Sequence, residues 1–134
     1  LLALQAVVGW TPDRWYAKEL AEPDPKVRRQ LDLIVTNVHN TPGDVLAEEI
    51  GLILLAGKPV PYDDPQAMAA LARVGRWDQR QLIDDLNNRR FSLVLLPANP
   101  RDELWTPEVL AAIHANYDLK FRDIWFTYQA KDLR

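Results

Sequence analysis

The stretch Phe91-Ser92-Leu93-Val94-Leu95-Leu96 carries the clearest fold signal in this 134-residue chain. It is apolar except for Ser92, and Arg90 and Pro97 bound it. Its short length and its boundaries favour a strand over a helix. Continuous apolar character is typical of a strand that is covered on both faces of a parallel sheet. We therefore expect these residues to form a central strand of an α/β domain.

Helix signals lie on both sides of this strand. Asp24-Pro25, Asp64-Pro65 and Thr106-Pro107 each place a capping side chain before a proline. Proline is tolerated at the first helical position, because its missing N–H would have no partner there. We expect helices after these three signals and a further helix after Asp78. The first helix should end before the break at Thr41-Pro42-Gly43.

Shorter segments predict the remaining strands. Asp44–Glu48 favours a short buried strand, and Pro59–Tyr62 favours a second. Between them, residues 51–56 form a continuous apolar run that periodicity assigns neither to a strand nor to a helix. We interpret this run as a short helix that ends at Gly57. Alternating apolar residues in 119–128 indicate two terminal strands, or one strand with a bulge.

The predicted order alternates helices with strands, which implies a sheet covered by helices. The expected fold class is α/β. In detail, we expect a three-layer, Rossmann-like domain with a small, mostly parallel sheet, helices on both faces and an antiparallel C-terminal edge. Residues 24–134 should form this soluble domain.

The start of the chain has a different character. Residues 1–10 are almost wholly apolar, and aromatic residues follow at Trp10, Trp15 and Tyr16. Aromatic residues are enriched where a helix leaves a bilayer. One interpretation is that residues 1–23 are the stub of a transmembrane helix and its membrane-proximal linker. The other is an N-terminal helix that packs on the core.

Composition excludes several functions. The chain has 16 Lys and Arg against 19 Asp and Glu, a net charge of -3, which argues against nucleic-acid binding. It has no cysteine, which excludes thiolate zinc sites and cysteine nucleophiles. Neither His39 nor His114 has a metal-ligand spacing, and no glycine-rich phosphate loop is present.

Acidic residues give the strongest candidate site. Carboxylates end or follow each of the first three predicted strands: Glu48 and Glu49, Asp63 and Asp64, and Asp102 and Glu103. If these strands are parallel, the carboxylates share one edge of the sheet, where such folds bind ligands. Hard oxygen ligands suit a divalent cation, and carboxylates also bind sugar hydroxyls. The alternative for Glu49 and Asp64 is helix capping.

Aromatic residues flank this edge. A tryptophan such as Trp105 can stack on a sugar ring, although sealing the core is the alternative. The candidate binding residues are therefore Glu48, Glu49, Tyr62, Asp63, Asp64, Asp102 and Trp105.

Several segments together resemble a known family. They are residues 42–49, 51–60, Asp64-Pro65, 75–78, 89–96 and 106–113, with Asn116-Tyr117. From about residue 24 to residue 128, the chain resembles the soluble C-terminal domain of bacterial multi-pass GT-C-type glycosyltransferases, the family 39-like relatives of dolichyl-phosphate-mannose–protein mannosyltransferases.

The resemblance implies a location and a partner. Such enzymes transfer a sugar from a polyprenyl-phosphate carrier, and their catalytic acidic residue lies between early transmembrane helices. No catalytic residue is therefore expected in this chain. The domain is expected on the extracytoplasmic side of the cell membrane, beside the transmembrane part of the same protein, where it covers the active site or helps to bind the acceptor.

Two other functions remain open from the residues alone. One is a stand-alone module that binds a glycan or a protein. The other is a small soluble enzyme that uses the acidic edge, with a divalent cation as its cofactor.

Overall fold

The computed structural model describes residues 24–62, 64–98, 105–122 and 125–131. The chain divides into two units, Leu1–Leu33 and Ile34–Arg134, and the described strands all lie in the second. The predicted transmembrane stub, residues 1–23, lies outside the described residues. Among the helices that are described, none has the length and apolar character needed to cross a membrane.

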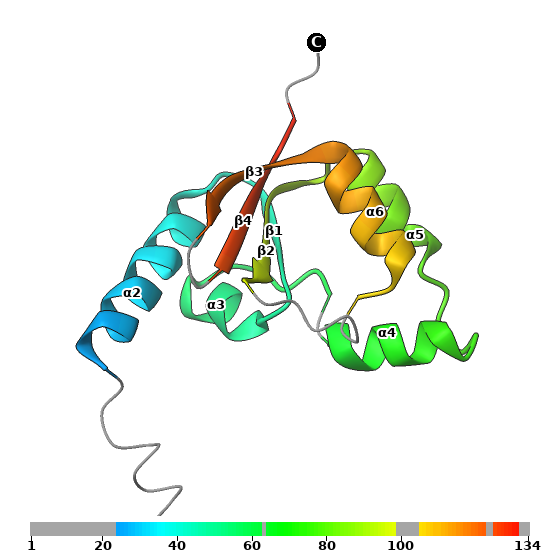
Figure 1. The fold of residues 1–134 in the computed structure, drawn as a ribbon, viewed down its shortest axis with the longest axis horizontal. Coiled ribbons are helices and arrows are strands. Elements are labelled where there is room, and N and C mark those ends of the chain that lie inside the picture. The colour runs from blue at the N-terminus through cyan, green and yellow to red at the C-terminus, as the bar shows by residue number, and fades with distance from the viewer. Residues whose placement is uncertain (1–23, 63, 99–104, 123–124, 132–134) are drawn as a thin grey trace, which may run out of the picture. The chain divides into compact units, whose positions relative to one another are not determined.

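The secondary structure alternates largely as expected (Figure 1). Helix α2 (Pro25–Asn40) ends before the predicted break, and residues 50–55 form a helix rather than a strand. The last two strands form separately, as the first of the two interpretations predicts. The elements after α2 are β1 (Asp44–Ala47), α3 (Ile50–Leu55), α4 (Pro65–Arg73), α5 (Arg80–Asn87), β2 (Phe91–Pro97), α6 (Pro107–Asn116), β3 (Tyr117–Arg122) and β4 (Trp125–Ala130).

The predicted strand at Pro59–Tyr62 is wrong. These residues are irregular and belong to no sheet. Pro59 and Pro61 have no backbone N–H, so a strand here would lack donors for a ladder. The second strand of the sheet is therefore β2, which lies beside β1.

The described strands form one mixed sheet in the order β1-β2-β4-β3. β1 pairs with β2 in parallel, whereas β4 pairs antiparallel with both β2 and β3. The expectation of a mostly parallel sheet is therefore wrong, although an antiparallel edge is present at β3. Only two residues separate β3 from β4, and a parallel pair needs a crossover of a dozen or more.

The main hydrophobic cluster lies between the sheet and the helices α5 and α6, which Figure 1 shows side by side. Strand β2 contributes Phe91, Val94 and Leu96 to it, and β4 contributes Tyr128. The helices contribute Leu82, Leu86, Val109, Ala112 and Ile113. The other face of β2 carries Leu93 and Leu95, which are also buried. Burial on both faces explains why β2 is continuously apolar.

Two strands carry an extra residue where their pairing shifts register. Phe91 lies opposite Asp44 but Leu93 lies opposite Val45, so Ser92 is the additional residue. In β3 the same shift makes Lys120 the additional residue. A bulge of this kind turns two successive side chains toward one face. Polar side chains therefore reach the face of the sheet that lies opposite α5 and α6.

Leu86→Ala should test the importance of the main cluster. Leu86 is fully buried, so we expect the free energy of unfolding to fall by about 2–5 kcal/mol. Leu55→Ala is the matched control, since Leu55 is 74% exposed and should change stability by less than about 0.5 kcal/mol. Urea unfolding followed by circular dichroism measures both, and equal losses would contradict this description of the core.

Candidate functional site

The predicted acidic residues mainly cap helices where the structure describes them. Glu49 is the N-cap of α3 and accepts a hydrogen bond from the N–H of Gly51 at 3.4 Å. Asp64 is the N-cap of α4 and accepts from the N–H of Ala67 at 2.8 Å. Glu48 is half-buried after β1, and its own N–H donates to the carbonyl of Leu95. The capping alternative is thus confirmed for Glu49 and Asp64.

Two of the other predicted residues, Tyr62 and Trp105, lie at the main hydrophobic cluster. Trp105 is buried in the main cluster, with 2% of its surface exposed. Asp63 and Asp102 lie outside the described residues. In the described part of the chain, no group of three or more histidine or acidic side chains is placed to hold a metal ion. Binding of a divalent cation stays a prediction.

Tyr62 takes part in a network of polar side chains instead. Its hydroxyl donates to Asp85 Oδ2 at 2.8 Å, and Arg90 Nη1 donates to the same oxygen at 2.7 Å. Arg90 Nε reaches Asp44 Oδ2 at 3.1 Å. The network ties the segment before α4 to the end of α5 and the start of β1. Burial and the hydrogen bond to Asp85 raise the pKa of Tyr62 to about 12.

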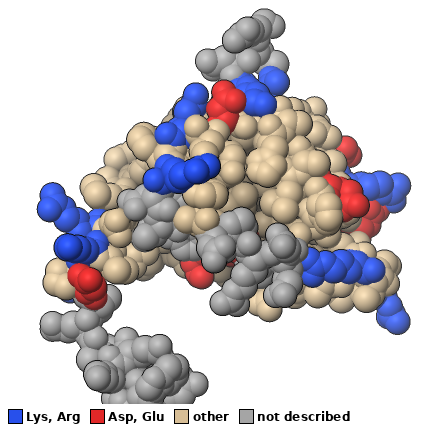
Figure 2. Space-filling view, in the orientation of Figure 1, with Lys and Arg blue, Asp and Glu red and all other residues tan. Residues whose placement is uncertain are grey.

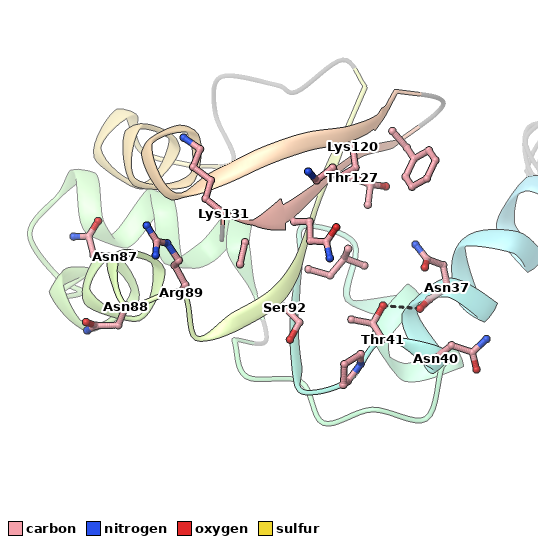
Figure 3. A pocket seen from close by; sticks show the side chains of 15 residues that line it. Asn37, Asn40, Thr41, Asn87, Asn88, Arg89, Ser92, Lys120, Thr127 and Lys131 are labelled. Carbon is pink, nitrogen blue, oxygen red and sulfur yellow. Dashed lines mark hydrogen bonds between the residues drawn. The ribbon is translucent and has the colours of Figure 1, made fainter. Parts of the chain in front are cut away.

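A pocket of about 900 Å³ lies on the face of the sheet opposite the main hydrophobic cluster. Its floor consists of side chains from β2, β3 and β4, including both bulges. In Figure 3, the ends of α5 and α2 stand on opposite sides of it. Its lining comprises Asn37, Asn40, Thr41, Pro42, Asn87, Asn88, Arg89, Ser92, Leu93, Lys120, Phe121, Thr127, Gln129, Ala130 and Lys131.

The lining has an unusual composition for an acidic chain. It holds three cationic side chains, five amides and three hydroxyls, but no carboxylate. Outside the pocket the charges mix, and Figure 2 shows basic and acidic side chains scattered over the face in view. The pocket therefore concentrates cationic, amide and hydroxyl side chains in one place. On the face in view in Figure 2, the described residues form no broad basic patch of the kind that binds nucleic acid.

Two of the three cations already have partners. Lys131 Nζ donates to the carbonyls of His114 and Ala115, at 3.1 and 2.7 Å, and so caps the C-terminal end of α6. Asp118 lies 3.9 Å from Lys120 Nζ and 4.0 Å from Lys131 Nζ. These exposed pairs are weak, but they place a carboxylate beside both lysines.

The third cation, Arg89, stands at a special backbone position. Helices α3, α4 and α5 end with the same pair of hydrogen bonds, the Schellman motif. At α5, Arg90 N–H donates to the carbonyl of Asp85 at 2.9 Å, and Arg89 N–H donates to that of Leu86 at 3.1 Å. The motif needs one left-handed residue, and at α5 this is Arg89, with φ of 54°.

Helices α3 and α4 have glycine at that position. Gly57 after α3 has φ of 70°, and Gly75 after α4 has φ of 67°. A residue with a side chain loses about 1–2 kcal/mol in this conformation, which glycine adopts freely. Arg89 therefore occupies a position where glycine would suit the backbone better.

The guanidinium of Arg89 is also poorly satisfied. Its Nε is buried and has no hydrogen-bond partner among the described residues. A buried donor without a partner costs about 1–3 kcal/mol. Neither the local backbone nor the described contacts account for arginine at this position.

Comparison with protein-family models, with curated proteins and with solved structures gives no match. The pocket and its side chains are therefore the structural basis for a proposed binding role.

Sequence reasoning missed the pocket because its residues come from five elements, which are the ends of α2 and α5 and the strands β2, β3 and β4. None of these residues belongs to a recognisable motif. Ser92 and Lys120 reach the pocket only through bulges. One local signal was available. The helix after Asp78 ends in Asn87-Asn88-Arg89-Arg90, without the glycine that ends the two helices before it.

Substitutions at the Schellman position should affect stability differently at α4 and at α5. Gly75→Ala should lose about 1 kcal/mol from backbone strain alone, since an added Cβ would meet no atom within 4 Å. Arg89→Gly should leave stability unchanged or raise it by up to about 1 kcal/mol, because relief of backbone strain offsets the added conformational entropy of the unfolded chain. Thermal unfolding of both variants measures this, and a clear loss in Arg89→Gly would show that Arg89 supports the fold.

Stability should fall at high pH. The folded-state pKa of Tyr62 and that of buried Tyr117 are both about 12, above the value of 10 expected in the unfolded chain. The folded state therefore holds these protons more tightly, and this contribution to stability is present below pH 10 and lost as the pH rises toward 12.

Tyr62→Phe isolates one of these two tyrosines. It should lose about 0.5–1.5 kcal/mol at pH 7 with its hydrogen bond, and its decline in stability between pH 10 and 12 should be shallower. Urea unfolding at several pH values tests this, and identical slopes in both proteins would contradict it.

Proposed function

We propose that this chain is a ligand-binding accessory domain of a membrane glycosyltransferase that uses a polyprenyl-phosphate-linked sugar. In this proposal the domain lies on the extracytoplasmic side, beside the transmembrane part of the same protein, and helps to bind the acceptor. The carboxylate-free, amide-rich pocket is the observation that carries the binding role. The family comes from the resemblance of the sequence segments.

The chemistry of the lining suits a sugar. Amide side chains both donate and accept hydrogen bonds, as sugar hydroxyls do. Phe121 lines the pocket with 67% of its surface exposed, so its ring offers an apolar face to a pyranose. The volume of about 900 Å³ falls within the range of small-molecule sites.

The same lining favours binding over catalysis. It contains no histidine, cysteine or carboxylate that would act as a general base or an activated nucleophile. The alternative of a small soluble enzyme depends on the acidic edge, where Glu49 and Asp64 cap helices. A stand-alone glycan-binding module would use the same pocket. Apolar segments of ~20 residues upstream in the reading frame would distinguish the accessory domain from it.

We also propose the finer architecture of three layers, related to Rossmann-like folds. Helices α5 and α6 form one layer against the main cluster. Leu52 and Ile53 of α3 are buried near β1, which supports a second helical layer on the opposite face.

Phe121→Ala should weaken saccharide binding without harming the fold. We expect about fivefold lower affinity, because an aromatic contact contributes about 1 kcal/mol. Thermal stability should hardly change, since Phe121 is largely exposed. The assay is an amide NMR titration of the 134-residue chain with maltose, cellobiose and mannobiose, in which shifts should concentrate at pocket residues.

Leu119→Ala is the control for that substitution. Leu119 lies on the same strand but opposite Tyr128 and outside the pocket lining, so its loss should leave affinity unchanged. Absence of saccharide-induced shifts at the pocket, for all three sugars at tens of millimolar, would overturn the proposed function.

A further inference from the structure

Arg89 is the feature of the pocket that the fold does not explain. Helices α3, α4 and α5 end in the same hydrogen-bonded motif, and the left-handed position is Gly57, Gly75 and Arg89 respectively. Glycine would satisfy this motif with less backbone strain. Strained residues of this kind concentrate at ligand sites, where the strain is retained for function.

The side chain of Arg89 has unused binding capacity. Its Nε is buried and has no hydrogen-bond partner among the described residues. An arginine keeps its charge and carries five N–H donors in a planar fork. A carboxylate or phosphate can satisfy such a group by accepting two parallel hydrogen bonds.

The surroundings of Arg89 leave room for that partner. The pocket lining includes no carboxylate, and the nearby Asp118 lies beside the two lysines. In Figure 3, Arg89 stands with Asn87 and Asn88 on one side of the pocket. The end of α5 carries partial negative charge, which by itself disfavours an anion. At the end of α5, attraction of an anion therefore depends on the guanidinium of Arg89.

We propose that the pocket binds a hydroxyl-rich small molecule that carries an oxyanion, with Arg89 as the residue that recognises the anionic group. The amides and the ring of Phe121 bind the neutral part of this molecule, so the inference rests on the proposed function and specifies its ligand. A sugar acid and a sugar phosphate share the required chemistry.

The test compares four probes on the 134-residue chain by amide NMR titration: glucuronate, glucose 6-phosphate, glucose and inorganic phosphate. Either charged sugar should bind at least about tenfold more tightly than glucose, as expected for charge-assisted hydrogen bonds. Whichever of the two binds more tightly identifies the oxyanion as carboxylate or phosphate. Binding of inorganic phosphate as tightly as the charged sugars would overturn the hydroxyl-rich part of the proposal.

Arg89→Gly should remove the preference for the charged sugars and leave glucose binding unchanged, without loss of thermal stability. Arg89→Lys should keep only part of the preference, since an ammonium lacks the planar fork. Arg76→Gly removes the same charge at an exposed position outside the pocket, directly after Gly75. It should change neither the affinity for the charged sugars nor the affinity for glucose.

Two results would overturn the role of Arg89. One is equal affinity for glucose and both charged sugars, which leaves saccharide binding by the pocket intact. The other is an equal loss of affinity in Arg89→Gly and Arg76→Gly, which would assign the effect to net charge. Absence of binding by all four probes would count against the proposed function as well.

Discussion

The antiparallel ladder between β2 and β4 joins the final hairpin to the rest of the sheet. It runs from Leu93 opposite Gln129 to Pro97 opposite Trp125. This pairing gives β2 a neighbour on each side, since β1 occupies the other. It also sets which side chains of the hairpin point to each face, because alternation along a strand leaves no freedom once the register is fixed. Tyr128 is thereby directed into the core, and Thr127 and Gln129 toward the pocket.

The two faces of the sheet differ because two strands break strict alternation. The bulge at Ser92 allows Phe91 and Val94 to reach the same hydrophobic cluster, although two residues separate them. The bulge at Lys120 brings an exposed aromatic ring, Phe121, to the polar face. Bulges of this kind are common where a sheet re-aims side chains beside a ligand site. The same sheet thus supports the main hydrophobic cluster on one face and a largely polar pocket on the other.

The helix ends show where local preference and site chemistry disagree. At α3 and α4, glycine satisfies the left-handed position and the motif is purely structural. At α5 the same backbone carries Arg89, which introduces strain and a buried donor at the rim of the pocket. Natural sequences are consistent with their folds at most positions, and exceptions concentrate where a residue serves a site.

The sequence by itself determined the elements whose signals are local. A proline after a capping residue marked the starts of α2, α4 and α6, and the apolar run of β2 marked the central strand. These signals depend only on residues that are neighbours in sequence, so they can be recognised without knowledge of the fold. The prediction failed at Pro59–Tyr62, where proline chemistry should have been weighed against the apolar pattern.

Tertiary structure alone decided the direction of the strands and the position of the site. Whether β4 pairs with β2 or only with β3 depends on contacts between segments about thirty residues apart, which no local pattern encodes. The expected site followed from a parallel sheet, whose strand ends would have brought the carboxylates together. In the observed fold, Glu49 and Asp64 instead cap the N-termini of α3 and α4. The pocket forms where α2, α5 and the bulged strands converge, because their pairing brings together residues that are remote in sequence.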